Sequence, residues 1–294
     1  MSKIVKRKYT VRDWRKLLPI TDRLKYRRNS LVSRIYCSRQ SPDTEAVLRA
    51  LAERGHPKLL ATIAFNKPWL IDLMVRAVAR HMPQWRLIVA DNSNQAQARD
   101  EIRRICDSAG VLYVGLPPNP EWSINRSHGI AINWIVRNVI LKARPVSFGV
   151  LDHDCFPFGP DPVSHVIENQ PVYGLERTSR FAPGAWYLWP GYAFFNLASL
   201  GDVTFDFNHD QSLWLDTGGC NWHSIYKGLD RATLLFPSEP ADDEHPAGLV
   251  NNAGAFVDRT FCHIGSMGHR SEAGRQEHVA ALRGLIEQSI AEPT

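Results

Sequence analysis

The sequence predicts an α/β protein with a mostly parallel sheet flanked by helices and with a basic amino-terminal arm. From residue 58 to residue 154, short apolar runs alternate with segments whose apolar residues recur at the helical period. The connections between them are short, as in parallel βαβ units. Positive charge is concentrated in residues 1–40, which hold 13 Lys or Arg and 2 Asp, whereas the whole chain carries a net charge of +5.

The chain divides into three expected parts. Residues 1–57 form the basic arm and a first helix, residues 58–270 form the main α/β domain, and residues 271–294 form a terminal helix that packs on the same domain. With 294 residues, of which 44% are hydrophobic, the chain is large enough to bury one large core.

Capping and turn residues bound the elements of the first half. Ser41 or Asp43 begins a helix and Gly55 ends it, Pro68 occupies a first helical turn, and Gly110 closes another helix. The expected order is a helix at 41–55, a strand at 58–65, a helix at 68–82, a strand at 85–94, a helix at 95–110, a strand at 111–116, a helix at 125–143 and a strand at 145–154.

The second half has a less regular pattern. Residues 171–196 are rich in aromatic residues, Gly and Pro, and predict strands and loops around a pocket. Residues 205–228 contain an acidic, Gly-rich turn followed by a helix from about Asn221. Residues 232–240 predict a late strand, and residues 272–290 predict the terminal helix.

Several classes of protein are disfavoured by composition. No run of 18 apolar residues exists, so no membrane-spanning helix is expected, and the first residues lack the apolar region of a secretory signal. The five Cys are scattered without a Cys-x-x-Cys pair, which argues against a disulfide scaffold or a zinc site. A reducing, cytoplasmic setting fits best.

The basic arm allows three interpretations. It is a solvated arm that packs on its own domain or on a second subunit, or it binds an anionic membrane surface, or it binds nucleic acid. Trp14, Leu17, Leu18 and Ile20 lie among the charges, as in an interfacial helix at the inner face of a membrane. No nucleic-acid recognition motif is visible beyond charge.

Two carboxylates end the strand expected at 145–154. In "SFGVLDHDCFPFG", residues 147–159, an apolar run stops at Asp152 and Asp154. Ligands of open α/β sheets bind beyond the carboxyl ends of the strands, and paired carboxylates there suit a divalent cation that carries phosphate. Asp91 ends the second strand, and right-handed crossovers place its end on the same edge. The alternative is a pair of solvated turn carboxylates.

The order of motifs resembles a GT-A fold glycosyltransferase, closest in pattern to the family 2 type, over roughly residues 58–270. The matching residues are Asn66 in "IAFN", Asp91 in "IVADNSN", Arg126 and Gly129 in "NRSHGIA", Asp152 and Asp154 in "VLDHD", Asp216 in "LDTGG" and His263 in "FCHIG". The chain departs from the family pattern in four places: the first loop lacks Pro, Ser127 replaces Asn, Cys155 replaces a further Asp, and Leu215 replaces Glu.

The resemblance implies a Rossmann-like GT-A domain that transfers a sugar from a UDP-, GDP- or dTDP-sugar to a hydroxyl of a saccharide or lipid-linked acceptor, with inversion, in surface polysaccharide or glycoconjugate synthesis. It implies a bound Mn²⁺ or Mg²⁺ held by Asp154, with Asp152 beside it and His263 completing the shell. The residues it implies for the nucleotide-sugar are Asn66, Asp91, Asn92, Arg126 and Asp152.

The same resemblance implies that Asp216 takes the proton of the acceptor hydroxyl, with Asp210 as its rival. Each assignment has a structural alternative: an Asx turn for Asp91, a packed histidine for His263 and a helix N-cap for Asp216. The aromatic residues Trp186, Tyr187, Trp189 and Tyr192 stack on sugars or simply fill the core.

Two other classes compete with a glycosyltransferase. A nucleotidyltransferase needs a Gly-rich phosphate loop after the first strand, and "AFNKPWL" contains no Gly. A non-catalytic protein, which is a degenerate family member or a binder of nucleotide-sugar or nucleic acid, would show no activity with metal and donor.

Overall fold

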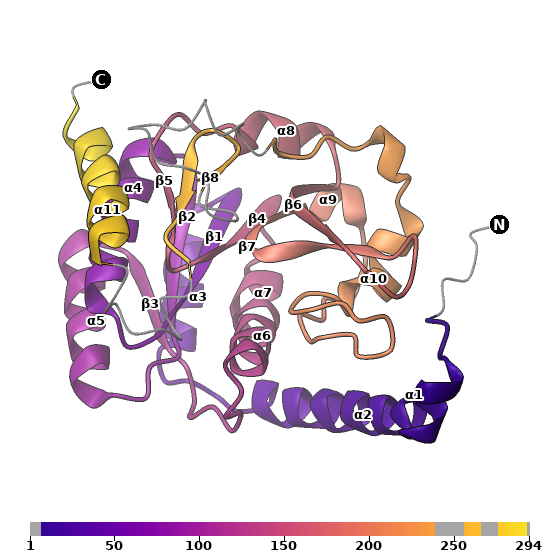
Figure 1. Cartoon of the computed structure of the whole chain (residues 1–294). Helices are drawn as coiled ribbons and strands as arrows, with labels where there is room; N and C mark the ends of the chain where they lie inside the picture. Colours follow the sequence, from indigo (N-terminus) through magenta and orange to yellow (C-terminus); the bar gives the residue numbers. More distant parts are fainter. Residues whose placement is uncertain (1–6, 239–255, 266–275, 293–294) are drawn as a thin grey trace.

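The computed structural model describes residues 7–238, 256–265 and 276–292, and its centre is a six-stranded sheet with the order β3-β2-β1-β4-β7-β6 (Figure 1). The first four of these strands are parallel, and β7 and β6 run antiparallel to their neighbours. The strands are β1 (Lys58–Ala64), β2 (Arg86–Asp91), β3 (Leu112–Gly115), β4 (Ser147–Asp152), β6 (Val172–Thr178) and β7 (Trp186–Asn196). The predicted α/β class with a mostly parallel sheet is confirmed.

Helices cover both faces of this sheet. The α-helices are α1 (Val11–Arg15), α2 (Leu18–Cys37), α3 (Thr44–Arg54), α4 (Pro68–His81), α5 (Ala96–Ala109), α6 (Ile124–Ile135), α7 (Leu141–Ala143), α8 (Val163–Asn169), α9 (Leu197–Leu200), α10 (Asn221–Ser224) and α11 (Gln276–Ala291). Helices α4, α5, α8 and α11 contribute to one hydrophobic cluster, and α2, α3 and α6 contribute to the other.

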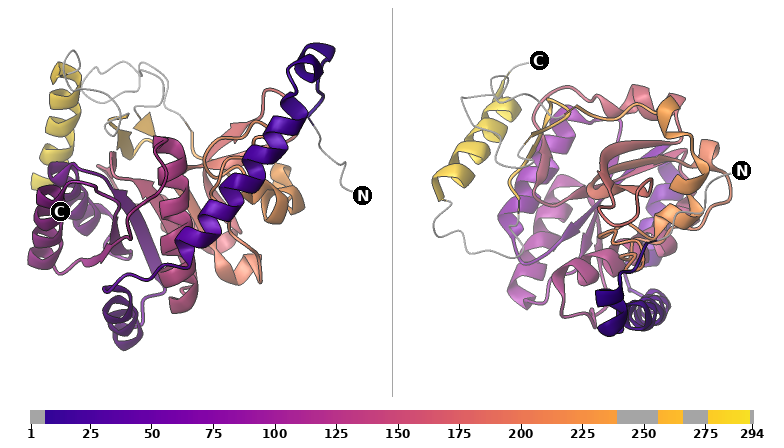
Figure 2. Two further views of the ribbon diagram at one scale, coloured as in Figure 1. Left: turned by 90° about the horizontal axis from the view of Figure 1, so that it is seen from below. Right: turned by 45° about the vertical axis from the view of Figure 1, so that its right-hand side comes forward.

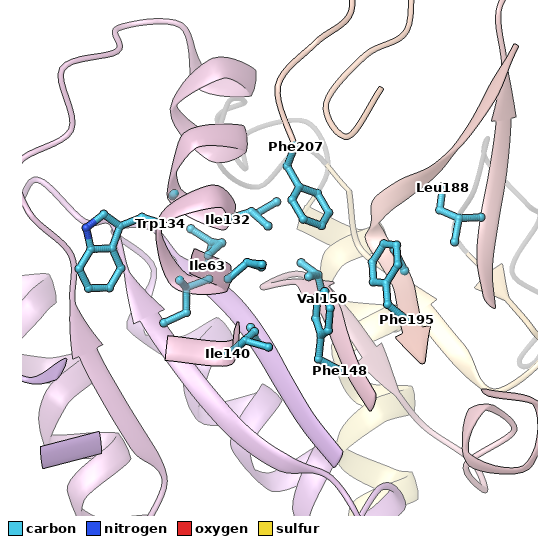
Figure 3. Close-up of a cluster of buried hydrophobic side chains, with 14 of the residues drawn as sticks. Ile63, Ile132, Trp134, Ile140, Phe148, Val150, Leu188, Phe195 and Phe207 are labelled. Carbon is cyan, nitrogen blue, oxygen red and sulfur yellow. The ribbon is translucent and has the colours of Figure 1, made fainter. Parts of the chain in front are cut away.

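The central strands are buried on both faces, which explains their continuous apolar runs. Along β1, Leu59 and Ile63 pack into the cluster beside α6, whereas Leu60 packs into the cluster beside α4. Figure 3 shows part of the first cluster, where Ile132 of α6 lies on the side of Val150, Phe148 and Phe195 of the sheet, whereas Trp134 points to the other side of the helix.

The helix expected at 125–143 is divided by a π-helical segment at Val136–Ile140.

The late strand expected at 232–240 is wrong over its described part, residues 232–238, where a 3₁₀ turn (Arg231–Thr233) is followed by irregular chain. The backbone of Leu235 hydrogen-bonds to the side chain of Gln170 and not to a neighbouring strand. The apolar residues of this segment therefore pack although its backbone pairs with no strand.

A small second sheet brings the late part of the chain beside the end of β4. It consists of β5 (Cys155–Pro157), β9 (Phe261–His263) and β8 (Phe256–Val257), in the order β5-β9-β8. Beyond it, α11 packs on α4 and buries Leu282 and Ile286 completely. The first residues of the helix expected at 272–290 lie outside the described part of the chain.

The described part of the basic arm is helical and packs on its own chain. Figure 2 shows α2 running along the outside of the fold, with α1 at its far end. Ser33 accepts a hydrogen bond from Asn133 of α6. Arg7, at the start of the described arm, forms a buried ion pair with Asp22 at 3.0 Å and lies over the aromatic ring of Trp214. None of the described helices is long and apolar enough to cross a bilayer.

Candidate active site

A cavity of about 900 Å³ lies at the carboxyl ends of β1, β2 and β4. Its position is the one expected for a ligand site in an open α/β sheet. Five of the predicted site residues line it: Asn92, Asp152, Asp154, Asp216 and His263. The other lining residues used below are Ser93, Asn94, Pro117, Asn119, Glu121, Trp122, Asn125, His128, His153, Trp189 and Thr217.

Asp152, Asp154 and His263 form a cluster of metal-binding side chains in the cavity wall. One ligand atom from each residue lies within 4.8 Å of the ligand atoms of the other two. The pairing of β5 with β9 sets this arrangement, because Cys155 stands opposite His263 and the Ile264 backbone N–H donates to the Asp154 carbonyl oxygen. His263 Nε2 lies 3.4 Å from Asp154 Oδ1.

The donor set suits a divalent cation. Two carboxylates and one imidazole combine hard oxygen ligands with a nitrogen, a set that favours Mn²⁺ over Ca²⁺ and leaves other positions for phosphate oxygens or water. The edge of the Trp189 indole packs on the His263 ring, with ring centroids 4.7 Å apart, and limits its rotation. The residues present therefore fit a bound metal.

His128, which the sequence analysis did not single out, lies against the same carboxylates. Its Nε2 is 3.0 Å from Asp152 Oδ1. Burial disfavours the charged imidazole, but the carboxylates of Asp152, Asp154 and Asp216 outweigh that effect and raise the pKa of His128. His128 thus lies beside Asp152, about one turn of α6 beyond the amino-terminal end of the helix.

His153 also lines the cavity, although the alternation of an extended strand would direct it away from its two Asp neighbours. The chain turns after Asp152, so the alternation of a strand no longer applies there. His153 Nδ1 accepts a hydrogen bond from the Phe65 backbone N–H at 3.2 Å. Burial lowers the pKa of His153, and because Nδ1 accepts the Phe65 hydrogen bond, the neutral ring carries its proton on Nε2.

Asn66 organises the loop after β2 and does not itself line the cavity. Its φ of 51° is in the left-handed region that Asn tolerates better than most residues. Its Oδ1 accepts hydrogen bonds from the backbone N–H groups of Asn94 and Gln95, and its own N–H donates to Ser93 Oγ. Asn66 thereby fixes the segment that carries Ser93 and Asn94 in the cavity wall.

Asp91 lies at the carboxyl end of β2, is fully buried and is not a lining residue. Its Oδ1 accepts from the Ser93 N–H at 2.9 Å, which is the Asx turn of the alternative interpretation, and its Oδ2 accepts from the Tyr113 hydroxyl at 2.8 Å. Arg99 approaches to 3.8 Å. The next residue, Asn92, lies in the cavity wall, where its side chain hydrogen-bonds to Ser127 and Asn119.

Arg126 does not line the cavity but supports its rim. Its Nε donates to Glu121 at 3.1 Å, and its guanidinium lies over the Trp122 ring. The same carboxylate pairs with Arg28 of α2. Glu121 is buried beneath these two cations, whereas Trp122 is 83% exposed at the mouth. The rim is therefore tied directly to the amino-terminal arm.

Asp216 is 58% exposed and faces the cavity. Its Oδ1 accepts from the Thr217 N–H at 2.8 Å and lies 3.1 Å from His209 Nε2. Burial lowers the pKa of His209, and the carboxylate of Asp216 offsets only part of that effect. Gly218, with φ near 90°, makes the turn that follows. Asp216 is thus an accessible carboxylate on a well-braced loop.

Asp210, the rival of Asp216, is fully buried and is not a lining residue. It accepts hydrogen bonds from Ser212 Oγ and the Leu213 N–H, and His223 Nε2 lies 2.5 Å from its Oδ2. Burial raises the pKa of Asp210, but these hydrogen bonds outweigh it and leave the pKa below the usual value. Asp210 therefore stabilises the loop that carries Asp216.

The four aromatic residues separate into two groups. Trp186, Tyr187 and Tyr192 are buried in the core, and Trp189 lines the cavity. Sequence reasoning missed His128, His153 and Glu121. The stretch "NRSHGIA" contained a signal for His128. Residues three apart on a helix share a face, and His128 follows Asn125, which also lines the cavity, by three residues.

Comparison with known proteins gives little further guidance. No family model matches the chain, and no curated protein matches it. One similar solved structure is the mannosyltransferase PcManGT from Pyrobaculum calidifontis in complex with GDP-Man and Mn²⁺, with 11% sequence identity and a TM-score of 0.38. The match covers 67% of this chain and 61% of that protein. A similarity this distant carries no argument about the site.

Proposed function

We propose that this protein is a metal-dependent glycosyltransferase that moves a sugar from a nucleoside-diphosphate donor to a hydroxyl group. The observation that carries the proposal is the Asp152–Asp154–His263 cluster in the wall of a 900 Å³ cavity, at the carboxyl ends of parallel strands. A cavity of this size accommodates a ligand such as a nucleotide-sugar. The same cavity contains a separate, exposed carboxylate, Asp216.

The donor's diphosphate gains negative charge as its bond to the sugar breaks. A divalent metal, Mn²⁺ or Mg²⁺, bound by Asp154, Asp152 and His263 would supply the positive charge that stabilises this leaving group. His128, whose pKa the surrounding carboxylates raise, lies beside Asp152 at the same wall. Asn92, Ser93 and Asn119 present amide and hydroxyl groups suited to a base or ribose.

Asp216 is the group that we assign as base. It accepts the proton of the acceptor hydroxyl while that oxygen bonds to the anomeric carbon and the nucleoside diphosphate departs, which gives inversion. Asp91 and Asn66 hold the donor side of the cavity in place through the loop after β2. Arg126 holds the rim through Glu121.

We assign the acceptor to the saccharides, either free or lipid-linked. The reaction then belongs to the cytoplasmic assembly of surface polysaccharides or glycoconjugates. Trp189 and Trp122, which both line the cavity, offer apolar ring faces on which an acceptor sugar can stack.

Donor hydrolysis tests the proposal. The protein is mixed with UDP-, GDP- and dTDP-sugars, with Mn²⁺ or with EDTA, and released nucleotide is measured. We expect release from one donor only in the presence of metal, and a decrease of at least about 100-fold in Asp154→Asn, because metal stabilisation of the leaving group amounts to several kcal/mol. Asp202→Asn, which removes an exposed carboxylate outside the cavity, should behave as wild type.

A thermal shift experiment separates catalysis from simple binding. If no donor is hydrolysed but donor and Mn²⁺ together raise the melting temperature, the protein is a nucleotide-sugar binder without transfer activity. If neither raises it, both assignments of the cavity fail.

A further inference from the structure

The outer side of α2 carries large apolar side chains in solvent. Five of them lie between 49% and 60% exposed. These residues, called the outward stripe below, are Leu17 at the N-cap, Ile20, Leu24, Leu31 and Ile35. They are separated by three, four or seven residues, so they lie along one side of the helix. Within the described part of the chain, nothing covers this stripe.

The side of α2 that packs on the fold is mixed in character. Pro19, Tyr36 and Cys37 are buried there together with Asp22, Asn29 and Ser33. A surface helix normally exposes its polar side, whereas α2 buries three polar residues and leaves five large apolar ones in solvent. An apolar strip that the fold leaves uncovered on a 20-residue helix indicates an interaction surface.

Basic residues border the outward stripe on both sides. At 3.6 residues per turn, Arg23, Arg27 and Arg34 fall on one border, and Lys25 falls on the other beside Arg28, whose charge is already paired with Glu121. An apolar stripe bordered by cations favours an anionic surface as its binding partner. Pairing two copies of the stripe would bring these cations together, and like charges across an interface oppose association.

We propose that α2 docks on an anionic lipid surface, with the outward stripe in the acyl boundary and the bordering cations at the headgroups. An apolar side flanked by cations is the arrangement of helices that lie in the plane of a membrane. Trp14 of α1, which is also exposed, is suited to the interface. This inference does not depend on the proposed function.

Docking would also place the cavity at the membrane. Arg28 pairs with Glu121, which lines the cavity, and the Tyr36 hydroxyl donates to the carbonyl oxygen of Pro117 in the same wall. Both contacts attach α2 to the cavity rim. A lipid-linked acceptor would then meet the site without leaving the bilayer surface.

Vesicle flotation of the full chain tests the proposal. The vesicles contain phosphatidylcholine alone or phosphatidylcholine with phosphatidylglycerol. We expect binding to the anionic vesicles only, weakened by salt. Neutralising Arg23 and Arg27 together should weaken binding roughly 30-fold, at about 1 kcal/mol per basic residue. Leu24→Glu with Leu31→Glu should weaken it about 100-fold, because two apolar side chains no longer insert.

Matched variants identify the surface. Leu235→Glu changes a similarly exposed apolar residue elsewhere, and Arg104→Gln with Arg283→Gln removes two exposed charges from α5 and α11, on the opposite face of the sheet. Both should bind as wild type does. Circular dichroism and melting temperature establish that each variant is folded.

Three results would overturn the proposal. These are equal binding to neutral and anionic vesicles, unchanged binding of the stripe variant, and a wild-type dimer that binds no vesicles and becomes monomeric when Leu24 and Leu31 are replaced. The last result would make the stripe an interface between copies of the chain. Donor hydrolysis in solution, measured in parallel, reports on the cavity and not on α2, so the two proposals fail independently.

Discussion

Gly129 of α6 offers a prediction in which local and tertiary effects have opposite signs. Within a helix, replacing Gly by Ala stabilises by about 1 kcal/mol. In this structure, however, a Cβ at residue 129 would lie 2.6 Å from the carbonyl oxygen of Phe207, whereas ordinary contact begins at 3.4 Å. The carbonyl must therefore move by about 0.8 Å, the difference between these two distances. Overpacking of this kind costs about 1–3 kcal/mol.

We therefore expect Gly129→Ala to lower the free energy of unfolding by about 1 kcal/mol, measured by urea denaturation. Gly284→Ala in α11 is the control, because a Cβ there has nothing within 4 Å. It should raise the free energy of unfolding by up to about 1 kcal/mol. The refuting result is a Gly129→Ala protein as stable as Gly284→Ala.

The same substitution should reduce activity. The Phe207 carbonyl oxygen accepts a hydrogen bond from the Gly218 N–H, two residues beyond Asp216. Displacing that carbonyl displaces the loop that carries the assigned base. A misplacement near 1 Å can cost about 100-fold in rate, so transfer should fall far more than stability does. Unchanged transfer in Gly129→Ala would count against the role of this loop.

Three further predictions concern single residues. Asp154→Asn should abolish the rise in melting temperature that Mn²⁺ and donor produce together, while leaving the melting temperature of the free protein nearly unchanged. Asp210→Asn should lower the free energy of unfolding by about 1–2 kcal/mol at pH 7, since a hydrogen-bonded buried charge is lost. Because folding lowers the pKa of Asp210 below 3.8, its contribution is present above that pH and disappears in more acidic solution, so wild type and variant should converge there. Arg7→Ala, which leaves Asp22 without its ion pair, should cost about 2 kcal/mol and speed amide exchange in α1 and in the amino-terminal half of α2.

Matched substitutions separate these effects from general damage. Asp202→Asn controls for loss of a carboxylate, and Arg12→Ala controls for loss of an arm cation, because Arg12 is exposed. If Asp210→Asn remains less stable than wild type by the same amount at all pH values, the assigned titration is incorrect. If Arg7→Ala leaves exchange in the arm unchanged, the arm is held by other contacts.

The sequence alone determined the βαβ order and the edge at which the cavity lies. Apolar runs and helical periods act within a few residues, so β1, α4, β2 and α5 could be read from the chain with their ends nearly correct. The position of Asp152 and Asp154 followed from the end of one such run. The prediction of a late strand was wrong because an apolar run does not show how its backbone is paired. Its apolar residues pack against the core, while the backbone of Leu235 pairs with a side chain.

Tertiary structure decided which polar groups face the cavity. Asp91 and Asp210 have the same local appearance as Asp154 and Asp216, yet only Asp154 and Asp216 line the cavity, and the carboxylates of the first two are held by hydrogen-bond donors away from it. His263 reaches Asp154 only because β9, about a hundred residues later in the chain, pairs with β5. The outward stripe of α2 could likewise not be assigned from its sequence, since the period of a helix shows that it has two sides but only packing decides which side the fold covers.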